Sequence, residues 1–189
     1  MMIEVYDPGH GGKDPGAVGP TGLREAFVTF GVADLVAAIR REAGATVCLT
    51  RRAEEGPELK PRADLANRCK AGLFVSIHCN GAPNREARGI EAWYHGHSAE
   101  GKRLAAYVYD ALTKEFPDAG RRGVMSDTTR YKSGFAVLRE TFMPAVLIEL
   151  DFISHPEREK EMGTAAWRER AASAIARGVE AYLARKEAA

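Results

Sequence analysis

Hydrophobic and polar positions recur along the chain with two spacings, which predict strands and helices in turn. Apolar residues three and four apart predict helices at about residues 24–43, 61–71, after residue 98 and from 164 onward. Alternating or wholly apolar runs predict strands at residues 2–6, 45–50, 73–77, 89–94, 135–138 and 145–149. The charged, glycine-rich stretch 117–134 is expected to be a loop. This order predicts an α/β fold, a mostly parallel twisted sheet with helices on both faces, as one domain over residues 1–189.

Ionisable side chains occur where the predicted strands end, and ligands of such sheets bind at the carboxyl ends of strands. The first strand runs into the loop 7–12, which contains His10, and the third is followed by His78. The last strand ends in Glu149, and Glu25 opens the first long helix. Two histidines and a glutamate are the ligands of one kind of catalytic zinc site, with one position left for water. Glu149 is then available as a general base.

Each of these four residues also has a structural explanation when it is taken alone. Glu25 has the charge expected in a first helical turn, and His10 is an ordinary polar residue of a loop. His78 and Glu149 are harder to explain in this way, because an unpaired ionisable group at the end of an apolar strand costs desolvation free energy. It is the joint placement of the four residues at strand ends that favours a metal centre.

Composition narrows the class of protein without indicating an activity. The chain has 27 Lys and Arg against 26 Asp and Glu, a net charge of +1, which argues against nucleic-acid binding through a basic face. No apolar run approaches the roughly 18 residues of a membrane span, and no apolar signal segment precedes Ile3. Cys48, Cys69 and Cys79 are an odd number without metal-binding spacing, so we expect small buried thiols and no disulfide framework.

The amide content of the chain is unusually low. Its 189 residues include three Asn and no Gln, against 19 Arg. Heat-adapted proteins contain fewer of the thermolabile residues Asn and Gln, so we hypothesise that the chain is thermostable.

Five motifs in order carry a resemblance to a known family. They read DPGHGGKDPGA at residues 7–17, GLRE at 22–25, SIHCN at 76–80, VLR at 137–139 and MPAVLIE at 143–149. Together they resemble the zinc-dependent N-acetylmuramoyl-L-alanine amidases of the third amidase family, which are cell-wall hydrolases. The resemblance covers residues 3–182.

This resemblance implies a phosphorylase/hydrolase-like fold and hydrolysis of the amide between the lactyl group of N-acetylmuramic acid and L-alanine in peptidoglycan. By position, it implies one Zn²⁺ per chain, held by His10, Glu25 and His78, with Glu149 as the catalytic glutamate. Two other hypotheses about the function remain open. The first is a zinc peptidase or other amidohydrolase acting on a different amide, and the second is a non-catalytic peptidoglycan-binding module.

Two further residues are candidates for substrate contact, and two depart from the family pattern. Asn80 follows the ligand His78 closely enough to donate to the stem peptide, and the forked guanidinium of Arg139 suits a peptide carboxylate. Asp151 and His155 stand where many relatives have Gly and Asn. Asp151 either shares a face with Glu149 and raises the pKa of one carboxyl, or follows a turn and faces water. His155 precedes Pro156 and is expected to cap a short helix.

We expect a monomer without nucleic-acid partners. Without a signal peptide, it would be made in the cytoplasm and act on the cell wall, as a phage endolysin does after release through a membrane pore. Otherwise it would be the excised domain of an exported protein.

Overall fold

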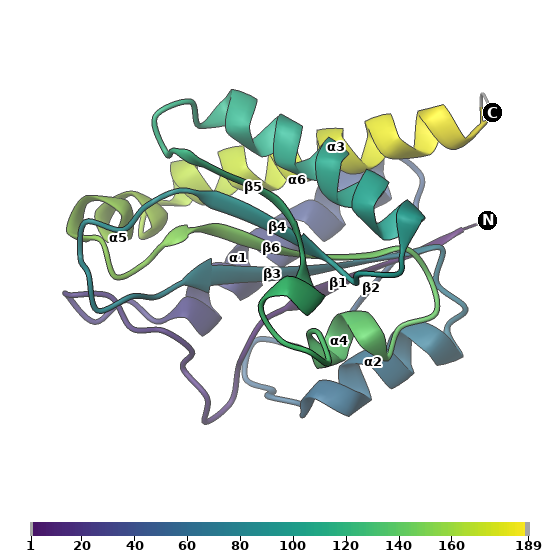
Figure 1. Cartoon of the computed structure of the whole chain (residues 1–189), viewed down its shortest axis with the longest axis horizontal. Coiled ribbons are helices and arrows are strands. Elements are labelled where there is room, and N and C mark those ends of the chain that lie inside the picture. The colour runs from purple at the N-terminus through teal and green to yellow at the C-terminus, as the bar shows by residue number, and fades with distance from the viewer. Residues whose placement is uncertain (1, 188–189) are drawn as a thin grey trace.

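A six-stranded twisted sheet forms the centre of the structure, a computed structural model that describes residues 2–187 (Figure 1). The sheet order is β2-β1-β3-β6-β4-β5. Strand β4 pairs antiparallel with β6, and the other four pairs are parallel, so the predicted mostly parallel sheet is confirmed. The strands are β1 (Ile3–Pro8), β2 (Thr46–Leu49), β3 (Leu73–Asn80), β4 (Ile90–Tyr94), β5 (Arg121–Ser126) and β6 (Ala145–Phe152).

Helices cover both faces of this sheet (Figure 1). Helices α1 (Glu25–Glu42), α3 (Ala99–Glu115) and α6 (Ala165–Glu187) pack together on one face. The other face is covered by α2 (Leu59–Arg68) and the single helical turn α4 (Ala136–Arg139). A short helix, α5 (Pro156–Met162), follows the end of β6.

Each face of the sheet has its own hydrophobic core. The larger core includes Val32 of α1, Ile77 of β3 and Ile148 of β6. The smaller core joins Phe74 and Leu147 to residues of α2 and α4. Because neighbours along a strand point to opposite faces, β3 and β6 supply both cores, which is why these central strands are apolar throughout.

The helices expected after residue 98 and from residue 164 are present, and Ser98 and Thr164 cap their first turns. Ser98 Oγ accepts a hydrogen bond of 2.9 Å from the Gly101 amide at the start of α3. Thr164 Oγ1 accepts one of 3.2 Å from the Trp167 amide at the start of α6. Each bond satisfies an amide that has no partner within its own helix.

Two sequence predictions in the region 117–138 are wrong. The stretch expected to be a loop contains β5, and the expected strand 135–138 is the helical turn α4. Strand β5 lies at the sheet edge and begins with two exposed arginines, so it lacks the alternation that a buried face imposes. The apolar run 135–138 packs into the smaller core, on the face of the sheet that α2 covers. There Phe135 packs edge-on against the ring of Trp93, with 5.7 Å between the ring centroids.

The expectation of small buried thiols is only partly confirmed. All three cysteines are free, although Cys48 and Cys69 are only half-buried, and Cys79 is buried. Within residues 2–187, no helix combines the length and apolar content needed to cross a bilayer.

Candidate metal centre

His10, Glu25 and His78 come together at the carboxyl end of the sheet. His10 lies in the loop after β1, Glu25 is the first residue of α1, and His78 lies near the end of β3. One ligand atom from each of the three lies within 4.8 Å of the others. His10 Nε2 is 3.2 Å from Glu25 Oε2, and His78 Nδ1 is 3.0 Å from Glu25 Oε1. The convergence expected from the strand ends is therefore present in the structure.

Backbone amides fix the buried carboxylate of Glu25 in this cluster. The Ala17 amide donates to Oε2 at 2.8 Å and the Cys79 amide donates to Oε1 at 2.9 Å. Burial opposes ionisation, but the bonds to His10 and His78 hold the pKa of Glu25 far below its usual value. Glu25 is therefore an oriented anion between two imidazoles.

Two glycines of the loop allow the imidazoles to approach so closely. A Cβ atom on Gly9 would lie 2.3 Å from Cε1 of His78, which no real side chain tolerates. A Cβ atom on Gly16 would lie 2.6 Å from both Glu25 Oε2 and His10 Cδ2, and Gly16 has φ of +66°. The space that the cluster occupies thus explains why these two positions are glycine.

Asp14 orients the ring of His10. Its Oδ2 atom lies 2.7 Å from His10 Nδ1, and its Oδ1 atom accepts a 2.9 Å bond from the Gly16 amide. This contact leaves Nε2 of His10 facing Glu25. Burial lowers the pKa of His10, but the bonds to Glu25 and Asp14 outweigh it and raise that pKa to about 8.

Two buried arginines hold the backbone of the loop. Arg62 donates to the carbonyl oxygens of Pro8 and His10, each at 2.7 Å, and pairs with Asp7 at 2.9 Å. Arg51 donates to the Pro8 carbonyl at 2.9 Å and to the Gly9 carbonyl at 3.0 Å. The loop that carries His10 is therefore bonded to protein groups at three successive carbonyls.

Glu149 lies beside the cluster on β6. It is paired in register with His78 on β3 and, across the antiparallel ladder, with Glu91 on β4. Its Oε2 atom is buried and has no hydrogen-bond partner in the part of the chain that the structure describes. Burial, followed by the charges of Glu25 and Glu91, raises the pKa of Glu149 well above its usual value. A carboxyl with an unused oxygen and a raised pKa is suited to accept and release a proton.

The donor set fits Zn²⁺. Two imidazole nitrogens and a carboxylate are ligands that this ion takes in catalytic sites, and tetrahedral bonds of about 2.0–2.1 Å place neighbouring ligand atoms about 3.3–3.4 Å apart. The observed nitrogen to oxygen separations of 3.0 and 3.2 Å are close to that spacing.

The two residues proposed for substrate contact have different surroundings. Asn80 ends β3, and its buried Nδ2 atom lacks a hydrogen-bond partner among the described residues. Arg139 is the last residue of the helical turn α4, and its polar contacts are with residues outside the cluster. Its guanidinium pairs with Glu140 at 2.9 Å and donates to the Ser133 carbonyl at 2.8 Å. It lines a cavity that includes Ala145, where β6 begins.

Asp151 does not face water, so that alternative is wrong. It is 2% exposed, and its Oδ1 atom accepts bonds from the amides of Gly89 at 2.6 Å and Phe152 at 2.8 Å. Strand β6 continues to Phe152, but the register with β3 shifts after Glu149. The charges that act on Glu149 come from other residues. His155 caps α5 as predicted, since its Nδ1 atom accepts a bond of 3.2 Å from the Glu157 amide.

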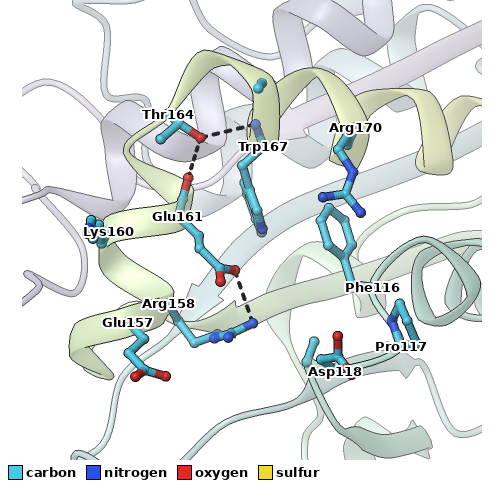
Figure 2. Close-up of a pocket in the computed structure, with 12 residues that line it drawn as sticks. Phe116, Pro117, Asp118, Glu157, Arg158, Lys160, Glu161, Thr164, Trp167 and Arg170 are labelled. Carbon is cyan, nitrogen blue, oxygen red and sulfur yellow. Dashed lines mark hydrogen bonds and ion pairs between the residues drawn. The ribbon is translucent and has the colours of Figure 1, made fainter.

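Cavity size alone does not locate this centre. The cavity in Figure 2, of about 610 Å³, lies between the end of α3 and helices α5 and α6. Phe116 and Trp167 are among its lining, and an ion pair of 3.0 Å joins Arg158 to Glu161 within it. It includes none of the predicted site residues. A cavity of about 550 Å³ borders the metal loop instead, and Asp14 is part of its wall.

Sequence reasoning missed two residues near the centre, Asp14 and Arg130. Asp14 stands four positions after His10, so a carboxylate within reach of a loop histidine was a usable signal. Arg130 lies over the rings of Trp93 and Tyr131, on the far side of Glu149 from the metal ligands. No signal in the sequence indicated that position, because residues 117–134 were expected to be an irregular loop.

The sequence and the fold of the chain are similar to those of known proteins. Residues 5–181 match the family described as N-acetylmuramoyl-L-alanine amidase. The amidase AmiA of Escherichia coli K12 is 30% identical over 219 residues, covering 96% of this chain and 76% of that protein. The solved structure of AmiC2 from Nostoc punctiforme has a TM-score of 0.90 at 35% identity and covers 97% and 98% of the two chains. The catalytic domain of CwlV from Bacillus (Paenibacillus) polymyxa var. colistinus has a TM-score of 0.89 at 32% identity, covering 97% and 99%.

Proposed function

The chain belongs to the N-acetylmuramoyl-L-alanine amidase family, and we propose that it cleaves its amide bond in peptidoglycan with one Zn²⁺ held by His10, Glu25 and His78. Glu149 acts as the general base. The observation that carries this proposal is the convergence of three metal-ligating atoms within 4.8 Å beside Glu149, a half-buried residue whose buried Oε2 atom has no partner among the described residues. Peptidoglycan is the substrate because the family's bond joins N-acetylmuramic acid to L-alanine, so the cell wall is the place of action.

The three ligands have separate tasks in this centre. Zn²⁺ held by such a set supplies Lewis acidity, which strengthens water as an acid and a carbonyl as an electrophile. His10 presents Nε2 because Asp14 occupies its Nδ1, and His78 presents Nδ1. Glu25 contributes the negative charge and is kept in place by two backbone amides.

Glu149 moves the proton in the reaction. Its carboxylate takes a proton from the attacking water and returns it to the nitrogen of the leaving L-alanine. The raised pKa suits both steps, because the carboxyl must hold the proton after the first step and release it in the second. No ion pair or hydrogen bond to another described side chain competes for Oε2.

Replacing Glu149 with Gln tests its role. The change keeps the size of the buried side chain and removes the base, so hydrolysis of purified peptidoglycan should fall about 10²- to 10⁴-fold. Zinc content, measured on the same samples, should stay at that of the unmodified chain. His78→Ala is the matched control and should lose both zinc and hydrolysis. Loss of zinc from Glu149→Gln would make Glu149 a ligand, and undiminished hydrolysis would refute it as the base.

Product analysis separates this reaction from hydrolysis of a different amide. Cleavage at the proposed bond releases peptide with a free L-alanine amine and leaves the glycan strand intact. A new amine on any other residue would refute the proposed bond, while leaving the metal centre in place.

A further inference from the structure

Arg130 stacks on the rings of Trp93 and Tyr131 beside the metal centre. We call these three residues the cationic ledge. The Arg130 guanidinium carbon is 5.6 Å from the centroid of Trp93 and 5.7 Å from that of Tyr131. Tyr131 is in turn packed edge-on against Phe135 at 5.4 Å. Arg130 is exposed, and its side chain makes no ion pair or hydrogen bond to any residue of the described chain. The aromatic rings therefore position a guanidinium whose donors are unused.

The ledge adjoins Glu149. Trp93 is paired with Leu147 on β6, and Glu91 with Glu149, so Trp93 and Glu149 point to the same face of neighbouring strands. Arg130 lies over Trp93 on that face and is close enough to Glu149 for its charge to oppose the burial that raises the pKa of this carboxyl. The sheet order places His78 on β3 on one side of Glu149 and Trp93 on β4 on the other.

Arg122, the neighbouring arginine, already has an acidic partner and so does not offer free donors to a ligand. Arg122 of β5 donates to Oε1 of the buried Glu91, whose Oε2 accepts a bond of 2.9 Å from Trp93 Nε1. Glu91 therefore uses the charge of Arg122, while Arg130 forms no ion pair with any acidic side chain that the structure describes.

The chemistry of the substrate indicates what Arg130 binds. In an N-acetylmuramoyl peptide, the lactyl carboxyl of the sugar is consumed in the scissile amide, whereas the peptide ends in a free carboxylate. A guanidinium fork matches a carboxylate with two parallel hydrogen bonds, and stacking on aromatic rings fixes its plane. From this placement we infer that Arg130 binds a carboxylate of the peptide on the leaving side of the scissile bond. This inference rests on the proposed function.

The inference also assigns a direction to the substrate. With its carboxylate on Arg130, the peptide extends over β4 and the sugar lies on the side of the metal loop. Arg130 is then a specificity residue, and it selects peptides that carry the anion.

Paired synthetic substrates test this role. One is an N-acetylmuramoyl peptide with free carboxyl groups, and the other is the same peptide with those groups amidated. Arg130→Ala should lower kcat/KM about tenfold on the acid, chiefly by raising KM, since a charge-assisted bond at an exposed position is lost. On the amidated peptide, the loss of kcat/KM in Arg130→Ala should be much smaller, because only the effect of the Arg130 charge on Glu149 then remains. Arg103→Ala, which removes an exposed arginine from α3, should leave both values unchanged.

Each outcome is decisive. An equal loss on both peptides would overturn the inference, because Arg130 would then act on Glu149 or on the fold. Unchanged kcat/KM on the acid would overturn it as well. An unmodified chain that hydrolyses neither peptide would refute the proposed function itself, and the inference with it.

Discussion

Replacing Asp14 with Asn tests how strongly one loop contact prepares the metal centre. The change removes the charge that faces His10 Nδ1 at 2.7 Å and keeps a side-chain oxygen for the Gly16 amide. Carboxylates that orient metal-binding histidines typically contribute 10- to 100-fold in metal affinity. Asp14 is 64% exposed, so water competes for the contact, and we expect about a tenfold loss.

The pH dependence of this loss follows from the same contact. The raised pKa of His10, about 8, means that a metal ion must displace a proton below that pH. At about pH 6.5 we therefore expect this competition to weaken the proposed zinc binding of the unmodified chain. Because Asp14 helps to raise that pKa, the variant suffers less competition. The tenfold loss should therefore appear in full at about pH 9 and shrink toward about pH 6.5.

Zinc dissociation constants from competition with a chromophoric chelator measure both effects. Asp110→Asn, which neutralises an exposed carboxylate on α3, should bind zinc like the unmodified chain at each pH. Equal affinity of Asp14→Asn and the unmodified chain at about pH 9 would refute the orienting role. A loss of the same size at both pH values would refute the proton competition.

Two further predictions concern stability. The pKa of Asp151 is raised because burial outweighs its bonds from Gly89 and Phe152, so the folded state loses stability as pH rises through that pKa. Asp151→Asn should gain stability relative to the unmodified chain between about pH 3 and pH 7 in urea denaturation, and parallel curves would contradict this. The low amide content predicts a melting midpoint above the mesophile range of about 45–65 °C, and a calorimetric midpoint within that range would refute the thermostability hypothesis.

The sequence predicted the central strands well because their burial leaves a clear signal. Strands β3 and β6 are covered on both faces and read as continuous apolar runs, and each carries an ionisable residue of the site near its end. The wrong predictions concern segments of the chain that are only partly buried. Strand β5 pairs on one side only, and its exposed arginines hide it. The run 135–138 is too short for hydrophobic periodicity to separate a strand from a helical turn.

The site residues could be predicted from the sequence only where secondary structure and topology position them. His10, Glu25, His78 and Glu149 follow from strand ends and a helix start, which topology brings to one edge. Arg139 was expected beside them only because the residues before it resemble a strand. Arg130 gives no such signal, since its position depends on packing against Trp93, which is distant in sequence and adjacent in space.

The arginine bonds beneath the metal loop have a consequence for how the chain responds to chelation. Many small zinc domains unfold when the ion is removed, because the metal is the main link between their ligands. Here Arg51 and Arg62 tie the loop carbonyls to the fold through protein groups alone. We therefore expect the chain to stay folded when the proposed ion is removed. We also expect chelation to abolish hydrolysis and added zinc to restore it without refolding.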